Sequence, residues 1–114
     1  MAQTIRITPD KLEEIRRYAK VLRDTGIAYK SLIVFGSSVK GTAKTWSDVD
    51  VCVVSSQFGQ NRFVDRLRLM KLTDDDTINI EPHPFSPEEL ADPWDPLAAE
   101  IRRYGIEVKI PHSF

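Results

Sequence analysis

Two aspartates at the start of a predicted strand are the clearest sign of chemistry in this sequence. Asp48 and Asp50 begin the run Asp-Val-Asp-Val-Cys-Val-Val. On an extended strand both carboxylates project from one face, while the valines project from the other. Neighbouring carboxylates repel each other, and a divalent cation held between them removes that conflict. Because carboxylate oxygens suit Mg²⁺, we predict that Asp48 and Asp50 are metal ligands.

Glu81 is the candidate for a third carboxylate. It ends an alternating segment that predicts a strand over residues 77–80. If that strand lies beside the two aspartates, Glu81 completes a site for two metal ions. His83 follows between two prolines. No partner for this histidine is visible in the sequence, so we interpret it as structural.

A turn after predicted strand 31–35 is the candidate phosphate site. Gly36, Ser37 and Ser38 form this turn, and Lys40 follows closely. Glycine lets the backbone approach a ligand, and a turn that leads into a helix directs unpaired N–H groups outward. Placed beside the aspartates, the turn would serve phosphoryl-type transfer. This interpretation requires that the carboxylates converge opposite the turn and are not already held in salt bridges.

The joint spacing of these motifs carries a family resemblance. Gly36-Ser37, ten intervening residues and Asp48-Val49-Asp50 together resemble the signature of nucleotidyltransferases of the DNA polymerase β superfamily. The surrounding residues are similar to its minimal nucleotidyltransferase (MNT) branch. The resemblance implies a polymerase β-like fold and transfer of a nucleoside monophosphate, with AMP from ATP as the leading choice, to an acceptor hydroxyl. Pyrophosphate would be the leaving group.

The resemblance also implies roles for individual residues. Asp48, Asp50 and Glu81 would be catalytic and would hold two Mg²⁺ ions, with Glu81 helping to remove the acceptor proton. The nucleotide-binding residues would be Gly36, Ser37, Ser38 and Lys40. The chain departs from the branch at two of these, with Ser38 in place of a basic residue and Lys40 in place of arginine. Lysine is a point charge and lacks the bidentate fork of arginine.

A protein partner is a further implication of the resemblance. Such proteins resemble the antitoxin half of pairs with all-helical HEPN toxins, in which the acceptor is a tyrosine of the toxin. Two alternatives stay open. The chain could be a non-catalytic binding module that neutralises a helical partner by occlusion, or the subunit of an enzyme that modifies a small-molecule hydroxyl such as an antibiotic's.

The elements that must position these residues follow from periodicity and capping signals. A helix begins at Thr8-Pro9 and ends before Gly26, and another over 63–72 is expected to turn Val64 and Leu67 inward. Further helices begin at Ser86-Pro87 and Asp95-Pro96, and strands are predicted over 31–35, 48–54, 77–80 and 106–110. We predict a two-layer α+β fold, a mixed sheet of about four strands with helices mainly on one face.

Composition limits the remaining possibilities. The 114 residues suit one domain over 1–114, and the net charge of −1 gives no general attraction to nucleic acid or an anionic membrane. The single Cys52 excludes an internal disulfide, which suits a reducing cytoplasm, and no run of apolar residues is long enough for a membrane span. We expect a cytoplasmic protein that binds a nucleoside triphosphate and whose acceptor site is completed when it associates with another protein chain.

Overall fold

The computed structural model describes residues 7–40 and 48–110, without the side chains of Ser38 and Lys40. The roles predicted for those two side chains therefore lie outside the described residues. Along the chain, the elements are α1 (Pro9–Asp24), β1 (Ser31–Phe35), α2 (Ser37–Lys40), β2 (Val49–Val54), α3 (Arg62–Met70), β3 (Ile80–Phe85), α4 (Pro87–Leu90), α5 (Pro96–Tyr104) and β4 (Ile106–Val108).

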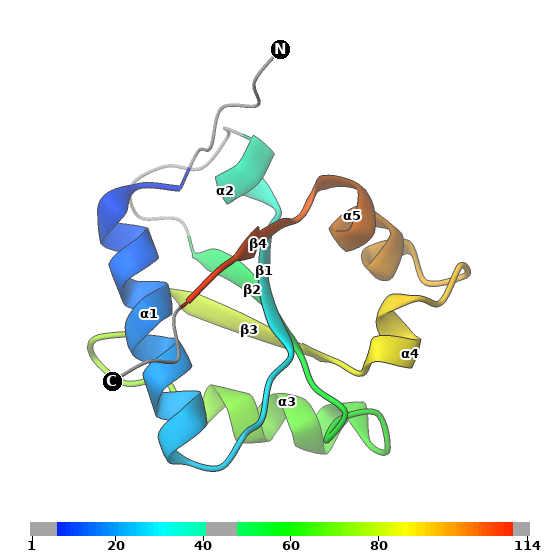
Figure 1. The fold of residues 1–114 in the computed structure, drawn as a ribbon, viewed down its shortest axis with the longest axis horizontal. Coiled ribbons are helices and arrows are strands. Elements are labelled where there is room, and N and C mark those ends of the chain that lie inside the picture. The colour runs from blue at the N-terminus through cyan, green and yellow to red at the C-terminus, as the bar shows by residue number, and fades with distance from the viewer. Residues whose placement is uncertain (1–6, 41–47, 111–114) are drawn as a thin grey trace.

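The strands form one mixed sheet in the order β3-β2-β1-β4 (Figure 1). β1 runs antiparallel to both β2 and β4, whereas β2 and β3 are parallel. The two central strands carry the most apolar sequences, because a strand paired on both sides and covered on both faces excludes water almost completely. The predicted fold class, a mixed α+β sheet of four strands, is confirmed.

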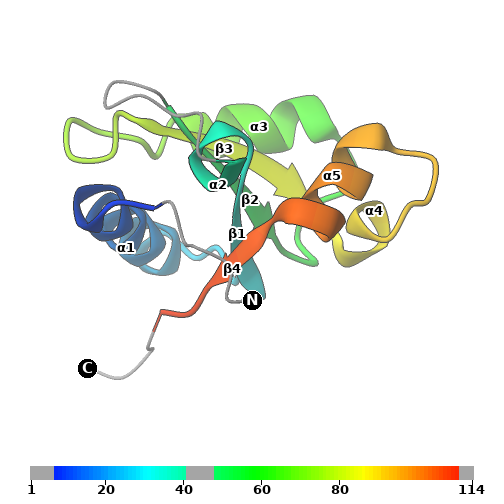
Figure 2. The same ribbon diagram turned by 90° about the horizontal axis from the view of Figure 1, so that it is seen from above.

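Helices lie on both sides of this sheet (Figures 1 and 2). On one side α1 packs Ile15, Ala19 and Leu22 against Val49, Val51 and Val53 of β2 in the main core. On the other side, Ala98 and Ile101 of α5 pack against a smaller cluster that includes Phe35, Cys52 and Phe85. On this face Asp50, which pairs with Phe35 at the end of β1, stays partly exposed.

The helix starts follow the capping signals in the sequence. Thr8 accepts a hydrogen bond from the backbone N–H of Lys11 at the start of α1. Ser86 forms a reciprocal capping box with Glu89 at the start of α4, and Asp95 caps α5. Such caps satisfy backbone donors that have no partner within the helix. Over residues 7–40 and 48–110, no helix combines the length and apolar content that a bilayer crossing requires.

The third strand corrects the boundaries predicted from the sequence. It spans Ile80–Phe85 rather than residues 77–80, and so runs through Pro82 and Pro84. The carbonyls of Asn79 and Phe85 accept hydrogen bonds from Val49 and Ser55 on the β2 side. Backbone groups alternate in direction along a strand, so both proline nitrogens point toward the unpaired edge of the sheet. Proline is tolerated there because no ladder hydrogen bond is lost.

Helix α3 also differs from the prediction. Val64 and Leu67, expected to face inward, are exposed, and the buried residue of this helix is Leu69. The hydroxyl of Tyr18 in α1 donates a 2.9 Å hydrogen bond to the carbonyl of Leu69, which ties the end of α3 to the core. Periodicity identified an apolar stripe correctly, but it could not show that α3 turns that stripe away from the sheet.

Candidate active site

The parallel register of β2 and β3 brings two carboxylates together. Asp50 lies directly opposite Glu81, and both side chains project from the face that α5 leaves partly open. The alternating valines of β2 point to the opposite face and are fully buried. Cys52 and Val54 are also buried on the Asp50 face, so β2 is anchored on both faces and displays Asp50 near its start. The sheet pairing thus makes neighbours of two acids that are distant in the sequence.

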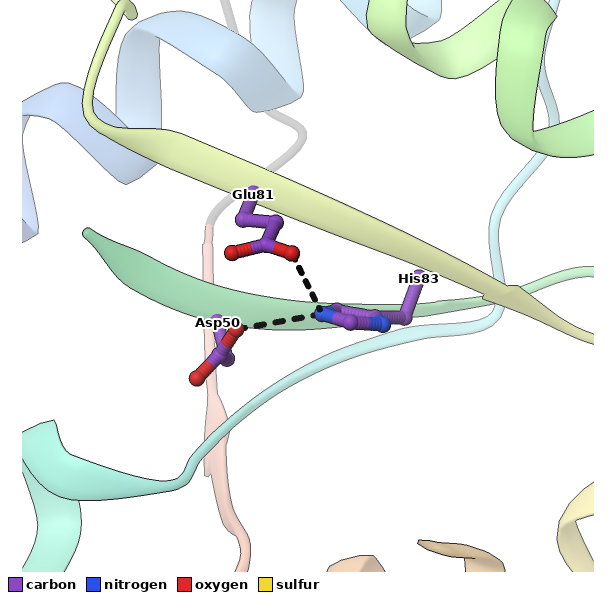
Figure 3. Close-up of side chains that lie close together, drawn as sticks. All are labelled: Asp50, Glu81 and His83. Atoms are coloured by element: carbon purple, nitrogen blue, oxygen red, sulfur yellow. Dashed lines mark hydrogen bonds and ion pairs between the residues drawn. The ribbon is translucent and has the colours of Figure 1, made fainter.

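His83 completes the cluster (Figure 3). Its Nε2 lies 3.1 Å from Oδ1 of Asp50 and 4.0 Å from Oε1 of Glu81. The imidazole packs edge-on against the ring of Phe35, with centroids 5.0 Å apart, and only 13% of the side chain is exposed. These contacts hold the ring in a fixed place between the two carboxylates.

The Gly36 turn lies against the same cluster. Gly36 has φ +80°, and a Cβ at this position would stand 2.6 Å from Oδ2 of Asp50. The positive φ favours glycine, and a Cβ here would displace the carboxylate of Asp50. Ser37 begins the short helix α2 immediately afterwards and is half-buried. The two halves of the sequence motif, the turn and the acidic strand, therefore meet in the fold.

The structure does not bring Asp48 into this cluster. Asp48 precedes the first residue of β2 and is exposed. Among the described residues, the group whose ligand atoms all lie within 4.8 Å of one another consists of Asp50, Glu81 and His83. This cluster spans two strands, and the role of Asp48 as a metal ligand beside Asp50 stays a prediction.

Glu81 is already engaged by a basic side chain. Arg66 of α3 places Nη2 3.1 Å from Oε1 of Glu81, with 42% and 39% of the two side chains exposed. The condition that the acids be free of salt bridges is thus met only in part. An ion pair this exposed contributes about 0–1 kcal/mol, so a cation or substrate can displace it at small cost.

A pocket of about 320 Å³ opens beside the cluster, at the edge formed by β3. Its wall consists of Arg62, Phe63, Arg66, His83, Pro84, Phe85 and Leu97. The guanidinium of Arg62 stacks 4.9 Å from the centre of the Phe85 ring and lies 3.5 Å from a carboxylate oxygen of Asp95. The pocket therefore combines aromatic walls with two arginine side chains.

Cys52 lies on the same strand face but does not contribute a reactive group. It pairs with His83 in the register and is completely buried. Burial raises the pKa of this thiol to about 12, because a thiolate would lose its hydration. Cys52 is therefore a protonated packing residue, in agreement with its position within an apolar run.

The donor set fits a divalent cation. Two carboxylates and one imidazole approach one another closely enough to contact a single ion. Carboxylate oxygens are the ligands of Mg²⁺ and Mn²⁺, and imidazole extends the range to other first-row metals. Asp50 and Glu81 are thus suited to bind the cation predicted from the sequence. Asp48 is exposed immediately before β2, two residues from Asp50 in the chain.

Two residues of the site were missed by sequence reasoning. His83 was interpreted as structural because its partner, Asp50, is 33 positions away and becomes visible only through the register of β2 and β3. Arg66 was one of several basic residues on a predicted helix, a pattern typical of a solvated surface. The signal that could have found His83 is its two-residue spacing from Glu81, which puts both on one strand face once the strand is extended.

Comparison with known proteins identifies the family. A family model described as a nucleotidyltransferase domain matches residues 13–95. No curated protein matches the chain in sequence at a significant level.

Two solved structures have the same fold. One is a candidate nucleotidyltransferase from Sulfolobus solfataricus, similar over 84% of this chain and 77% of its own, with 15% identity and a TM-score of 0.62. The other is a chain of a toxin-antitoxin crystal structure with AMP-PNP, similar over 82% of this chain and 70% of its own, with 23% identity and a TM-score of 0.55. The mixed α/β nucleotidyltransferase fold expected from the sequence agrees with these matches.

Proposed function

The chain belongs to the nucleotidyltransferase domain family, and from this premise we propose that it transfers AMP from ATP to a hydroxyl group of a helical protein partner. The partner in this proposal is a HEPN-type toxin, the acceptor is a tyrosine, and the chain acts as the antitoxin in the cytoplasm. The similarity of its fold to a chain of a toxin-antitoxin structure with AMP-PNP supports both the nucleotide and the kind of partner.

One observation carries the proposal. The Gly36 turn packs directly on Asp50, and Asp50 lies opposite Glu81 in the parallel register. A phosphate-binding turn and a pair of metal-binding carboxylates are the two parts that transfer to or from a nucleoside triphosphate requires. Their contact in the fold supports a single site that uses both.

In the proposed mechanism, Asp50 and Glu81, together with Asp48, hold divalent metal. When bound, Mg²⁺ neutralises phosphate charge and lowers the energy of the developing negative charge. Gly36 and Ser37 bind the β- and γ-phosphates, with Ser38 and Lys40 as further contacts. The acceptor oxygen attacks the α-phosphorus. The bond between the α-phosphorus and the oxygen that bridges to the β-phosphate breaks, and pyrophosphate leaves. Glu81 takes the hydroxyl proton.

The acceptor enters from the side of β3 in this mechanism. In-line displacement places the nucleophile opposite the leaving group, and the leaving pyrophosphate lies at the Gly36 turn. In the sheet order, β2 with Asp50 lies between β1, which leads into the Gly36 turn, and β3, which borders the pocket between α3 and α5. Its aromatic walls, Phe63 and Phe85, suit a phenol ring, whose hydroxyl would then point toward Glu81 and His83.

The α3 stripe favours a macromolecular acceptor over a small one. Phe63, Val64, Leu67 and Met70 form this stripe of exposed apolar side chains, and Phe63 also lines the pocket. Such residues at helical spacing, next to a site, are typical of a surface that receives a partner helix. The same stripe supports the second candidate function, a binding module that neutralises its partner by occlusion without chemistry.

Labelled nucleotide tests the proposal. The purified chain is incubated with ATP labelled at the α-phosphate, Mg²⁺ and a candidate helical partner of HEPN type, and label on that protein is measured. We expect transfer by the wild type, loss of at least about a hundredfold in Asp50→Asn, and no change in Glu88→Gln, an exposed carboxylate on α4. Mass spectrometry of the partner locates the added AMP on a tyrosine.

Three results would redirect the proposal. Transfer that persists in Asp50→Asn contradicts the metal assignment. Neutralisation of the partner without any added mass favours the binding module. Consumption of ATP with label only on a small-molecule hydroxyl favours the other alternative, a subunit of a small-molecule nucleotidyltransferase.

A further inference from the structure

The cluster at the open face contains a nitrogen donor that a magnesium site does not need. His83 extends Nε2 between the oxygens of Asp50 and Glu81, and the three ligand atoms lie within 4.8 Å of one another (Figure 3). Mg²⁺ is held by oxygen ligands, whereas imidazole is a ligand of the first-row transition cations. The donor set therefore differs from that of an all-carboxylate site.

From this geometry we propose that Asp50, Glu81 and His83 form a mixed oxygen and nitrogen metal site that prefers Mn²⁺, and other first-row divalent cations, to Mg²⁺. As an account of the catalytic metal, this inference rests on the proposed function. The binding preference itself rests only on the arrangement of the three side chains.

The distances already match those of a coordination sphere. Two ligands bound at about 2.1 Å on perpendicular axes lie about 3 Å apart. Nε2 of His83 is 3.1 Å from Oδ1 of Asp50 and 4.0 Å from Oε1 of Glu81. A cation can therefore enter with small movements of side-chain ends, and the strands do not have to shift.

The fold also holds the imidazole in place. Phe35 packs against its ring with an angle of 64° between the ring planes, and the backbone of His83 is in the ladder with β2. A metal-binding histidine held by its surroundings loses little freedom when the ion binds. Such constraint distinguishes His83 from a histidine that only happens to lie near an acid.

Arg66 is the competitor that the cation must displace. Its guanidinium pairs with Oε1 of Glu81, the oxygen that is also nearest to His83. Because Arg66 is 42% exposed on the outer helix α3, its side chain can turn into solvent without disturbing the core. The structure thus describes the cluster with one of its candidate ligand oxygens, Oε1 of Glu81, paired to an arginine.

Metal binding to the full chain, without nucleotide or partner, tests the inference. Mn²⁺ and Mg²⁺ affinities are measured by titration calorimetry after removal of bound metal with a chelator. We expect the wild type to bind Mn²⁺ roughly tenfold or more tightly than Mg²⁺, and His83→Asn to lose most of that preference. Pulsed electron paramagnetic resonance of bound Mn²⁺ should detect ¹⁴N coupling from the imidazole in the wild type.

The second histidine of the sequence provides the matched control. His112→Asn should keep the ¹⁴N coupling, and His83→Asn should lose it while keeping the wild-type circular dichroism and thermal midpoint. Equal affinities for Mn²⁺ and Mg²⁺, or bound Mn²⁺ without ¹⁴N coupling, would overturn the inference. Metal binding that behaves as expected without any transfer of AMP would count against the proposed function alone, so the two failures are distinguishable.

Discussion

Replacement of Gly36 by alanine should disable the site by displacing Asp50. The new Cβ would stand 2.6 Å from Oδ2 of Asp50. Ordinary contact between such atoms needs about 3.4 Å, so the carboxylate must retreat by about 0.8 Å. Because Oδ1 of the same group contacts His83 at 3.1 Å, that retreat disrupts the geometry of the whole cluster.

Gly36→Ala should lower both the stability of the fold and the affinity for metal, and the two effects can be measured separately. Alanine at φ +80° loses about 1–2 kcal/mol of stability from backbone strain, or roughly 4–10 °C in thermal midpoint for a domain of this size. Gly26 provides the control, because it has φ +86° and a Cβ added there would meet no heavy atom within 4 Å. Gly26→Ala should show the strain alone, whereas Gly36→Ala should also lose about tenfold or more in Mn²⁺ affinity.

Thermal unfolding and metal titration of the two variants measure these parts. Both should have lower midpoints than the wild type, and only Gly36→Ala should bind metal and nucleotide weakly. If Gly36→Ala binds Mn²⁺ as tightly as Gly26→Ala, the close contact between the turn and Asp50 does not affect metal binding, and the turn and the carboxylates do not act as one site.

The structure supports three further predictions. Arg66→Met should raise Mn²⁺ affinity about two- to fivefold in calorimetry, because the competing ion pair with Glu81 is worth at most about 1 kcal/mol; a lower affinity would show that Arg66 assists metal binding. Tyr18→Phe removes the buried hydrogen bond from the Tyr18 hydroxyl to the carbonyl of Leu69, which still accepts from the backbone N–H of Leu72, and should cost about 0.5–1.5 kcal/mol in urea denaturation; an unchanged midpoint contradicts this. Burial raises the pKa of Cys52 from 9.0 to about 12, so unfolding releases its proton above about pH 9 and stability falls as pH rises through that range. Its labelling by a thiol reagent at pH 8 should follow the unfolding rate, and fast labelling of the native protein would refute the burial argument.

Local signals in the sequence were sufficient for most of the fold. The caps at Thr8, Ser86 and Asp95 mark helix starts because a side chain satisfies a backbone donor a few residues away. The apolar run of β2 likewise indicated a buried strand, in which every residue except Asp50 is buried. Both features depend on residues that are close together in the chain, and a sequence displays such relations directly.

The parts that could not be predicted depend on relations between distant segments. β3 continues through Pro82 and Pro84 only because it is an edge strand, and nothing local indicates which strands lie at an edge. The contacts of His83 with Asp50 and of Arg66 with Glu81 follow from pairing and packing across the sheet. The spacing of the motif indicated the chemistry, whereas these distant contacts set the composition of the cluster.

The two prolines of β3 have a consequence for how copies of the chain can assemble. A bare strand edge is a template on which another chain can build, and each outward N–H is one of its attachment points. Pro82 and Pro84 remove two of those points from the edge of β3, and α3 packs alongside the same strand. Addition of a further strand at this edge is therefore disfavoured. The region beside the metal-binding cluster stays available for a helix of a partner protein to dock.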